Sequence, residues 1–563
     1  MGKRTLLLVL GLTACKGLIE LPKTAPSATV KPTDPTVPVV TLPTINTCAS
    51  EGSGTPARMR LLWQDAYLAE LSARLGPGAA AAASAKVGLS VPTNKTFRFD
   101  AAGSLLTPDA VSTLADAADA VAVWALSTDA NASSVFGCNA RTLTGSAAET
   151  CFTNFLNTTG TRLLRRPLSS AEVDDTLAFF RTEVAAGDGT SSQEGFRQGL
   201  ASLLVHPDFL YLRDRTTSKT SSTIDTYALA SRVSFALLGK GPDDALYAAA
   251  ADGTLADPEV MKAQVARLLA TQEARAEAAH FYRQWLGYDL LPQPAYSAAF
   301  LGGLDLTGYH DAALDELDTF MVGLTFDRHA APNDLLTSTF LPPVPAALSA
   351  IYGTAPGAQS VNADRAGFLT RAGMLSSGSD NWSIVGRGVP LLRNVLCQPL
   401  QPPANVDVGA AAAQAAMLKV SFRDRFDSIT APAGCQTCHH RINPLGAAQS
   451  DFDAVGRKIS TEVHYAGGMF DFQVPVNAQV DVSSDLGTGV MVNGGVALSN
   501  AVAESNQFGA CFANRFVAKS LGRLESADGC VAVAAQKAID AHGSILDAMQ
   551  AAFASPDFAT WHE

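Results

Sequence analysis

Charged residues are scarce in this chain of 563 residues: Asp, Glu, Lys and Arg make up 17% of it, and the net charge is -12. No cluster of Lys and Arg is long enough to form a phosphate-binding surface, which argues against nucleic acid as a partner. The apolar share of 47% is typical of a globular protein and not of a disordered one. A chain of this length is expected to form several domains.

Several common catalytic motifs are also absent. The sequence contains no H-E-x-x-H zinc-protease motif, no G-x-S-x-G nucleophile motif and no phosphate-binding loop. Ser379-Asp380-Asn381 resembles a β-lactamase element, but no matching S-x-x-K or K-T-G accompanies it. These absences leave open whether the chain is an enzyme at all.

The N-terminal residues predict export and a lipid anchor. Lys3 and Arg4 precede an apolar run, residues 5–12, that is too short to span a bilayer. The run leads into Leu-Thr-Ala-Cys at residues 12–15, which looks like a bacterial lipobox. We therefore expect residues 1–14 to be a cleaved signal peptide, Cys15 to be acylated, and the protein to be an outer-membrane lipoprotein facing the periplasm or the surface. The alternative is an ordinary signal peptide with a coincidental cysteine.

The pattern beyond the anchor predicts a mainly α, multidomain protein. Residues 15–50 are rich in Pro and Thr, which predicts an extended tether. Helix-start signals follow at Thr107-Pro108, at the capping box Ser169–Glu172 and at Asp257-Pro258. Residues 470–496 are richer in Val, Gly and Asn, which favours short strands or an ordered loop. We expect helical modules at residues 55–130, 135–215, 222–355 and 480–563, and a further module at 362–470.

Two parts of the chain echo each other. Cys151-Phe152 is matched by Cys511-Phe512, and Pro207-Asp208-Phe209 is matched by Pro556-Asp557-Phe558. The order of these features favours two related helical modules, with chance similarity as the alternative. The Pro-Asp-Phe segments are expected to end helices and to pack their aromatic ring.

One motif carries specific chemistry. Cys435-Gln436-Thr437-Cys438-His439 has the C-x-x-C-H pattern of c-type haem attachment. Two thiols one helical turn apart can add to the two vinyl groups of haem, and the adjacent His439 then serves as the proximal iron ligand. We therefore expect one covalent haem c at Cys435, Cys438 and His439, in a cytochrome-c-like segment in the C-terminal third of the chain. Only one such motif exists, which disfavours a di-haem peroxidase.

Other interpretations of this motif stay open. A zinc site would need further ligands, for which His440 and His464 are available. A thioredoxin-like redox pair would need a strand-to-helix context, and a plain disulfide with a neighbouring His is the simplest reading. For the sixth haem ligand we expect Met491, with Met469 and His464 as competitors. Arg232, Arg387 and Arg457 could pair with haem propionates, although structural salt bridges are the commoner role.

The remaining cysteines predict disulfides. Cys15 is assigned to lipid and two cysteines to the C-x-x-C-H motif, which leaves an even number in an oxidising compartment. The local pairings are Cys138 with Cys151 and Cys511 with Cys530, and Cys48 with Cys397 would be a long-range bridge. Six cysteines allow about fifteen pairings, so other connectivities stay open.

Short motifs also link the chain to a known family. They run from Arg58 to Phe558 and comprise Arg60-Leu61-Leu62, Tyr67, Leu75-Gly76, Arg165-Arg166-Pro167-Leu168, His206-Pro207-Asp208-Phe209, Tyr227-Ala228-Leu229-Ala230-Ser231-Arg232, Pro242-Asp243-Asp244, Gln284-Trp285-Leu286, Arg365-Ala366-Gly367, Arg387-Gly388, Leu396-Cys397, Asn443-Pro444-Leu445-Gly446, Phe452-Asp453-Ala454-Val455-Gly456-Arg457, Cys511-Phe512, Leu521-Gly522-Arg523 and Ser555-Pro556-Asp557-Phe558. Together they resemble the multidomain cytochrome-c-like proteins of unknown function that are abundant in planctomycetes and myxobacteria. The chain departs from that pattern at Asn443, where the family leads us to expect Asp, and at Ala447-Ala448, where a bulkier apolar residue is expected.

The resemblance implies cytochrome-c-like character and a lipoprotein or secreted location, without an established activity. We expect a membrane-anchored protein that relays electrons through one haem to an unknown redox partner. The alternatives are a haem-dependent oxidative enzyme acting on an extracellular substrate, and a binding or scaffold lipoprotein in which the C-x-x-C segment is structural. The sequence does not indicate the oligomeric state.

Overall fold

The computed structural model divides the chain into two compact units, each built from segments distant in sequence. The residues that it describes are 46, 48, 55–56, 59–89, 97, 106–187, 191–216, 223–359, 364–400, 418–522 and 529–562. Unit 1 includes Tyr282–Phe512, and unit 2 consists of Asn46–Phe281 and Ala513–Glu563. The predicted signal peptide, Cys15 and most of the predicted tether lie outside the described residues. The module boundaries given above stay a prediction.

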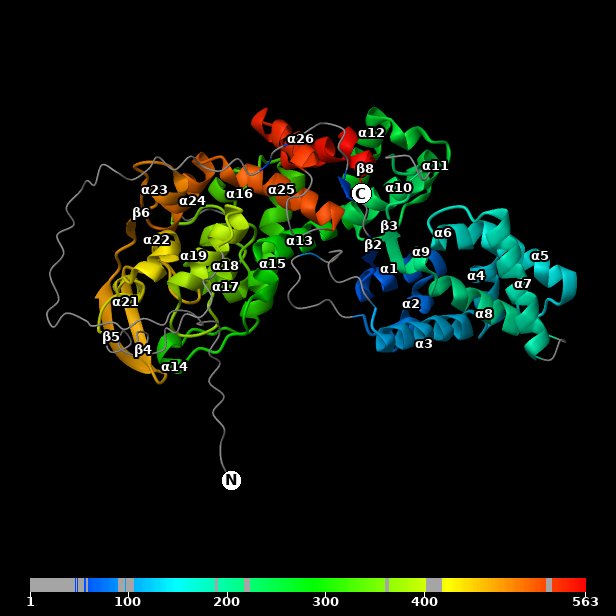
Figure 1. Ribbon diagram of the computed structural model, residues 1–563. Helices are drawn as coiled ribbons and strands as arrows, with labels where there is room; N and C mark the ends of the chain where they lie inside the picture. Colours follow the sequence, from blue (N-terminus) through cyan, green and yellow to red (C-terminus); the bar gives the residue numbers. More distant parts are fainter. Residues whose placement is uncertain are drawn as a thin grey trace, which may run out of the picture. The chain divides into compact units, whose positions relative to one another are not determined.

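Both units are mainly helical, which confirms the predicted fold class (Figure 1). The strands of the described residues pair only as two-stranded sheets: β1 with β8, β2 with β3, β4 with β5 and β6 with β7. The strands are β1 (Thr55–Pro56), β2 (Met59–Leu61), β3 (Tyr211–Arg213), β4 (Thr461–Ala466), β5 (Met469–Pro475), β6 (Gln479–Asp481), β7 (Met491–Asn493) and β8 (Trp561–His562). The short strands predicted within residues 470–496 are therefore present.

The helices of unit 2 surround an apolar core. They are α1 (Gln64–Leu75), α2 (Pro77–Ser84), α3 (Pro108–Ala125), α4 (Asp129–Phe136), α5 (Gly145–Phe155), η1 (Leu156–Gly160), α6 (Thr161–Leu163), α7 (Ser170–Gly187), α8 (Gln193–Leu204), α9 (Pro207–Leu210), α10 (Thr226–Leu238), α11 (Asp244–Ala251), η2 (Thr254–Ala256), α12 (Pro258–Leu269), α26 (Gly529–Asp540), α27 (Ile545–Ala554), η7 (Pro556–Ala559) and parts of α13 (Gln272–Leu286) and α25 (Gln507–Leu521). In this unit α3 packs against α2 and α8 (Figure 1).

The predicted helix starts are confirmed by their capping hydrogen bonds. The Thr107 side chain accepts from the Ala110 N–H at 3.2 Å, and the Asp257 carboxylate accepts from the Glu259 N–H at 2.8 Å. At α7, the Glu172 N–H donates to Ser169 Oγ at 3.3 Å while the Ser169 N–H donates to Glu172 Oε2 at 2.8 Å. These bonds satisfy backbone donors that the first turn of each helix leaves without intrahelical partners.

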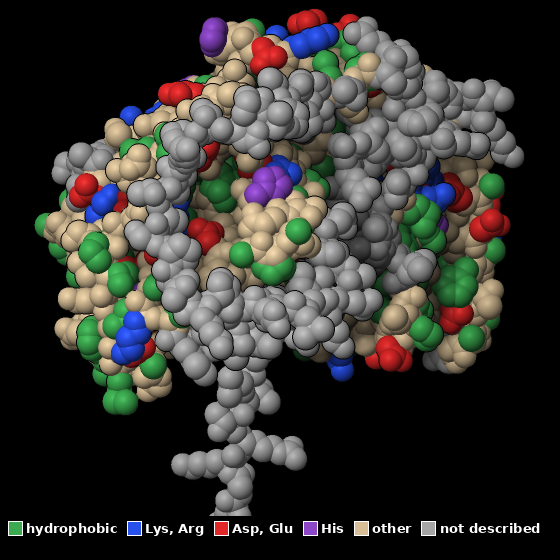
Figure 2. All heavy atoms as spheres, turned by 60° about the vertical axis from the view of Figure 1, so that its left-hand side comes forward, with side chains coloured by type: hydrophobic (Ala, Val, Ile, Leu, Met, Phe, Trp, Pro, Cys, Tyr) green, Lys and Arg blue, Asp and Glu red, His purple; other side chains and the backbone are tan. Residues whose placement is uncertain are grey.

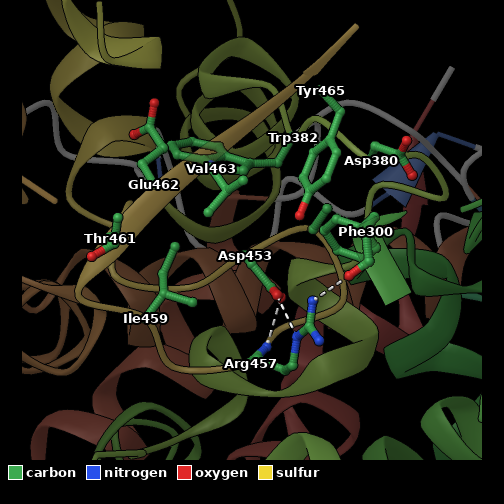
Figure 3. A pocket seen from close by; sticks show the side chains of 11 residues that line it. Phe300, Asp380, Trp382, Asp453, Arg457, Ile459, Thr461, Glu462, Val463 and Tyr465 are labelled. Atoms are coloured by element: carbon green, nitrogen blue, oxygen red, sulfur yellow. Dashed lines mark hydrogen bonds and ion pairs between the residues drawn. The ribbon is translucent and has the colours of Figure 1, made fainter. Parts of the chain in front are cut away.

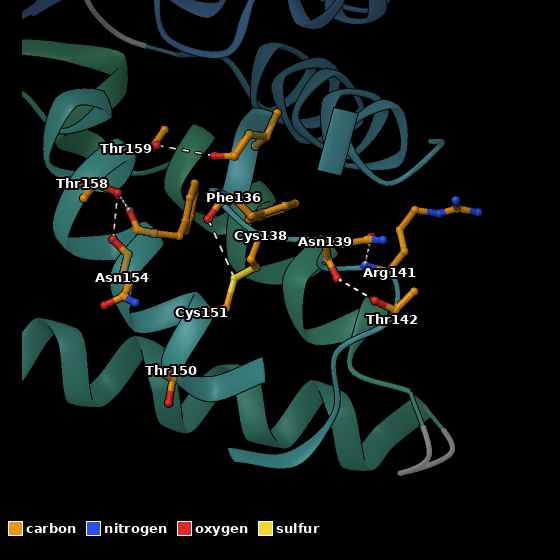
Figure 4. The surroundings of a disulfide bond; sticks show 12 residues. Phe136, Cys138, Asn139, Arg141, Thr142, Thr150, Cys151, Asn154, Thr158 and Thr159 are labelled. Carbon is orange, nitrogen blue, oxygen red and sulfur yellow. Dashed lines mark hydrogen bonds between the residues drawn. A yellow bond between two sulfur atoms is a disulfide. The ribbon is translucent and has the colours of Figure 1, made fainter. Parts of the chain in front are cut away.

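A cluster of phenylalanines and a disulfide join α5 to its neighbours. Phe152 stacks on Phe180 with ring centroids 4.6 Å apart, and Phe196 meets both rings edge-on. The disulfide Cys138–Cys151 links α5 to the segment after α4, close to the carbonyl of Phe136 (Figure 4). This pairing was predicted and is confirmed.

Among the described residues, none of the helices is both long and apolar enough on its own to cross a bilayer. Only α3 and α4 taken together reach that length and composition, and they meet at a bend of 114°. Leu114 and Val121 of α3 are buried in the core of unit 2.

Unit 1 holds the C-x-x-C-H motif. Its helices are η3 (Tyr288–Leu290), α14 (Ala298–Leu301), α15 (Tyr309–Val322), η4 (Gly323–Asp327), α16 (Asp334–Thr337), α17 (Ala346–Tyr352), η5 (Phe368–Thr370), α18 (Ala372–Leu375), α19 (Ile384–Pro390), η6 (Leu391–Val395), α21 (Phe422–Ile429), α22 (Ala433–Ala447), α23 (Ser483–Leu486), α24 (Gly495–Glu504) and the remaining parts of α13 and α25. Helix α22 carries the motif, with α19 and α21 packed against it.

Gly388 of α19 and Gly446 of α22 allow the close approach of the two helices. A Cβ at Gly446 would lie 2.1 Å from the carbonyl oxygen of Ile384, so only glycine fits there. Arg387 of α19 then donates to the carbonyls of Gln449 at 2.7 Å and Phe452 at 2.8 Å, just beyond the end of α22. Contacts of this kind satisfy carbonyls that lie past a helix terminus, and here they fix α22 against α19.

Candidate functional site

The motif side chains share one face of α22. Cys435, Cys438 and His439 occupy the first turns of the helix, and spacings of three and four residues place side chains on the same side. The helix starts after Pro432, whose carbonyl accepts the Cys435 N–H at 2.8 Å. Cys435 is buried, whereas Cys438 and His439 are half-buried. This face of the helix is therefore partly open.

The side of the molecule on which α21 and α22 lie in Figure 1 is turned forward in Figure 2. Acidic and basic side chains are interspersed over its described surface, and histidine side chains reach that surface. His440 is exposed, and its Nδ1 lies 2.5 Å from the carbonyl oxygen of Gln436. His440 is therefore an exposed residue whose Nδ1 is engaged by the backbone of its own helix.

The two motif thiols are set apart from the other described cysteines. Six of these form three disulfides, namely Cys48–Cys530, Cys138–Cys151 and Cys397–Cys511. Neither Cys435 nor Cys438 is disulfide-bonded. The interpretation of the motif as a plain disulfide therefore finds no support in the structure.

Two of the predicted disulfides are wrong. Cys511 was expected to pair with Cys530, and Cys48 with Cys397. The structure instead pairs Cys48 with Cys530 across 482 residues and Cys397 with Cys511 across 114 residues. The reason is that the boundary between the units falls within α25, so Cys511 belongs to unit 1 with Cys397, and Cys530 belongs to unit 2 with Cys48.

His439 is anchored by a residue one turn further along α22. Its Nδ1 lies 2.9 Å from Oδ1 of Asn443, whose side chain is buried. An amide oxygen only accepts hydrogen bonds, so Nδ1 of His439 must carry the proton. In the neutral ring the lone pair is then on Nε2, which makes no hydrogen bond to any other described residue.

The amide of Asn443 is itself held by two acceptors. Its Nδ2 donates to Oδ1 of Asp427 and to Oγ1 of Thr430, both at 2.9 Å. The hydroxyl of Thr430 donates to the carbonyl of Phe426 at 2.6 Å, so its oxygen is available to accept. Asn443, noted above only as a departure from the family pattern, is therefore the residue that links His439 to α21.

Helix α21 is positioned by its own N-terminus. Ser421 accepts the Asp424 N–H at 3.0 Å, and the Phe422 N–H donates to Oε1 of Glu462 in β4 at 2.5 Å. These bonds connect the start of α21 to the hairpin of β4 and β5. Asp427 and Thr430 are thereby placed beside α22, and no sequence signal identified them.

The other candidate ligands have different surroundings. His464 is buried between the rings of Phe422 and Phe472, with centroid distances of 4.2 and 4.1 Å, and its Nε2 lies 2.6 Å from a Glu462 carboxylate oxygen. Met491 in β7 is 55% exposed and Met469 in β5 is 68% exposed. His464 is thus occupied in a structural contact, and the assignment of Met491 as sixth ligand stays a prediction.

The rival interpretations of the motif gain no support. The described residues contain no group of three or more His, Cys, Asp or Glu side chains that could hold a metal ion, as a zinc site would require. Helix α22 follows α21 and not a strand, unlike the context of a thioredoxin-like pair.

The three arginines considered for propionates have structural partners. Arg232 pairs with Asp214 at 2.8 Å, and Arg457 pairs with Asp453 at 2.6 Å. Arg387 donates to backbone carbonyls near the end of α22. All three side chains therefore have structural contacts, the role that was expected to be commoner than pairing with haem propionates.

A small pocket of about 100 Å³ lies elsewhere in unit 1. Arg457 points toward Asp453 and the carbonyl of Phe300 in it (Figure 3). The ring of Phe300 stacks on Tyr296, and Arg387 lies over the ring of Trp382. Its aromatic and charged groups are already engaged within the protein, and no residue of α22 lines it. The pocket is therefore separate from the motif.

Three stretches of this chain match family models. Residues 151–214 match PSD5, residues 224–354 match PSD4 and residues 365–462 match PSCyt3, described as proteins of unknown function (DUF1595, DUF1592 and DUF1588). The PSCyt3 stretch contains the C-x-x-C-H motif, Asn443 and the α19–α22 contact. No curated protein and no solved structure matches the chain.

Proposed function

We propose that this chain is a membrane-anchored, extracytoplasmic, c-type-cytochrome-like protein that holds one haem through Cys435, Cys438 and His439 and relays electrons. The observation that carries the proposal is the donor set on α22. Two thiols outside the disulfides share a helix face with an imidazole whose Nδ1 is anchored and whose Nε2 is available. The short name of the matching family model, PSCyt3, is in keeping with a cytochrome-like domain.

The donor set fits the chemistry of covalent attachment. Each thiol would add across one vinyl group, forming a carbon–sulfur bond and passing its hydrogen to the neighbouring carbon, so no oxidant is needed. His439 would supply an iron-binding nitrogen through Nε2. Bound haem supplies one-electron redox chemistry, and the protein sets its potential and access.

The anchor is part of the proposal. Acylated Cys15 and the following tether would hold the two units at an outer-membrane surface. Metabolic labelling with a palmitate analogue tests this: wild-type protein should label, and Cys15→Ser should not. Labelling of the Cys15→Ser protein would refute the lipid anchor without touching the haem assignment.

An optical spectrum of the full-length protein, made with cytochrome-maturation machinery, tests the function. Sharp bands on reduction, without carbon monoxide or cyanide binding, are expected for an electron relay. Binding of either ligand would favour the oxidative enzyme, because it requires an open iron position. Absence of a Soret band would leave a binding or scaffold lipoprotein. A Cys435→Ser/Cys438→Ser protein is the matched control and should give no covalently bound pigment.

A further inference from the structure

We infer that Asn443, held by Asp427 and Thr430, is a positioning residue that fixes the ring of His439 and its Nδ1 proton and thereby tunes the reduction potential. This inference rests on the proposed function and deepens it. It concerns residues of this chain that contact the iron-binding histidine, His439, and not the haem itself. Groups that hydrogen-bond to a metal-ligating histidine set its orientation and basicity.

The orientation of the Asn443 amide is over-determined. Turning the amide over would place Oδ1 against the oxygens of Asp427 and Thr430, which both act as acceptors here. It would also place the NH2 group against Nδ1 of His439. The observed orientation avoids both of these unfavourable contacts and makes three hydrogen bonds, each at 2.9 Å. The buried amide thus has one favourable orientation, and that orientation requires a proton on Nδ1.

The charge in this network is displaced from His439. The group facing the imidazole is a neutral amide, and the carboxylate of Asp427 lies on the far side of it, with its side chain 51% exposed. A carboxylate at position 443 would instead face Nδ1 directly and draw its proton more strongly, which makes the imidazole a better electron donor. The neutral Asn443 is therefore expected to hold the potential above the value that Asp would give.

Opposite substitutions provide the test, with the full-length holoprotein as the material. In Asn443→Asp/Asp427→Asn the amide and carboxylate exchange places, so the hydrogen bonds from residue 443 to His439 and to residue 427 are retained while the charge moves next to His439. The Thr430 hydroxyl then donates to the new carboxylate instead of to the carbonyl of Phe426. The midpoint potential of this variant should fall below that of wild type. In Asn443→Leu the acceptor is lost, and the potential should rise. Glu504→Gln is the control: it removes an exposed carboxylate at the end of α24, which makes no hydrogen bond to Asn443, and it should leave the potential unchanged.

The outcomes separate this inference from the function on which it rests. Shifts of opposite sign in the two variants support the positioning role, because a merely structural residue would not move the potential in both directions. An unchanged potential in the exchanged variant, with haem attached, would overturn the inference and leave the proposed function standing. Should Asn443→Leu fail to fold, the exchanged variant alone decides. Absence of haem from the wild-type protein would overturn both.

Discussion

Gly388 of α19 lies directly against the backbone of Ile442 in α22. A Cβ at position 388 would be 2.3 Å from the carbonyl oxygen of Ile442, closer than any real contact. A backbone carbonyl cannot move aside as a flexible side chain would. The pair Arg387-Gly388 therefore has a structural reason: the glycine permits the crossing of the two helices, and the arginine secures the end of the helix that carries the candidate site.

The first prediction concerns this crossing. Gly388→Ala should lower the free energy of unfolding of unit 1 by about 2–3 kcal/mol, because the added methyl group forces the helices apart. Gly434→Ala is the control: it lies in the first turn of α22, and its Cβ would have no heavy atom within 4 Å. That variant should match wild type or be slightly more stable, since Ala favours helix. Urea unfolding checks both, and equal stabilities would contradict the account of the crossing.

The second prediction concerns the disulfides. In the chain-entropy model, removing the 114-residue link Cys397–Cys511 should cost about 5 kcal/mol, and removing the 13-residue link Cys138–Cys151 about 3 kcal/mol. Paired Cys→Ser substitutions at each bridge, followed by denaturant unfolding, measure the two losses. Peptide mapping without reduction should recover Cys48 linked to Cys530. A Cys511–Cys530 peptide would contradict the structure.

The third prediction concerns a buried carboxylate in unit 2. Asp208 accepts hydrogen bonds from Arg166 and Arg213 at 2.8 Å each and from Arg215 at 3.2 Å. Burial alone would raise the pKa of Asp208, but the hydrogen bond of Arg166 and the charges of Arg215 and Arg213 together lower it. Asp208→Asn should therefore destabilise the protein by about 3 kcal/mol at neutral pH, because the buried carboxylate shared by three arginines is lost, although Arg166 keeps Glu172 and Arg215 keeps Asp225.

The pH dependence of that loss follows from the sign of the shift. A carboxyl whose pKa is depressed on folding stabilises the native state above its unfolded pKa, and that contribution disappears as the pH falls through the folded pKa. The difference between wild type and Asp208→Asn should thus shrink in acid. Asp175→Asn, exposed on α7, is the control and should behave as wild type at both pH values. A difference in the free energy of unfolding that stays constant with pH would show that the charge of Asp208 does not contribute to stability.

Local features of this fold could be predicted from the sequence. The helix starts at Thr107, Ser169 and Asp257 depend on side chains within three residues of the atoms they cap, so the sequence pattern contains the interaction. The packed aromatics of the two echoed segments were also predictable, and Phe209 and Phe558 are buried.

Features that depend on tertiary contacts could not be predicted. Asp208 was expected only to belong to a helix terminator, but arginines from both sides of it in the sequence converge on its carboxylate. The pairings of Cys48 and Cys397 depend on how the chain divides into units. At the candidate site, the C-x-x-C-H motif was evident, but Thr430 and Asp427 precede Asn443 by 13 and 16 residues and meet it only once α21 packs on α22.

The most direct test of the account is the mass of the peptide that contains Cys435, Cys438 and His439. The mature protein would be isolated from its native host and digested without reduction. Thioether addition keeps every atom of both partners, so the account predicts this peptide at its own mass plus the full mass of one haem. A peptide found at its unmodified mass, or lighter by two hydrogens as a disulfide, would contradict it.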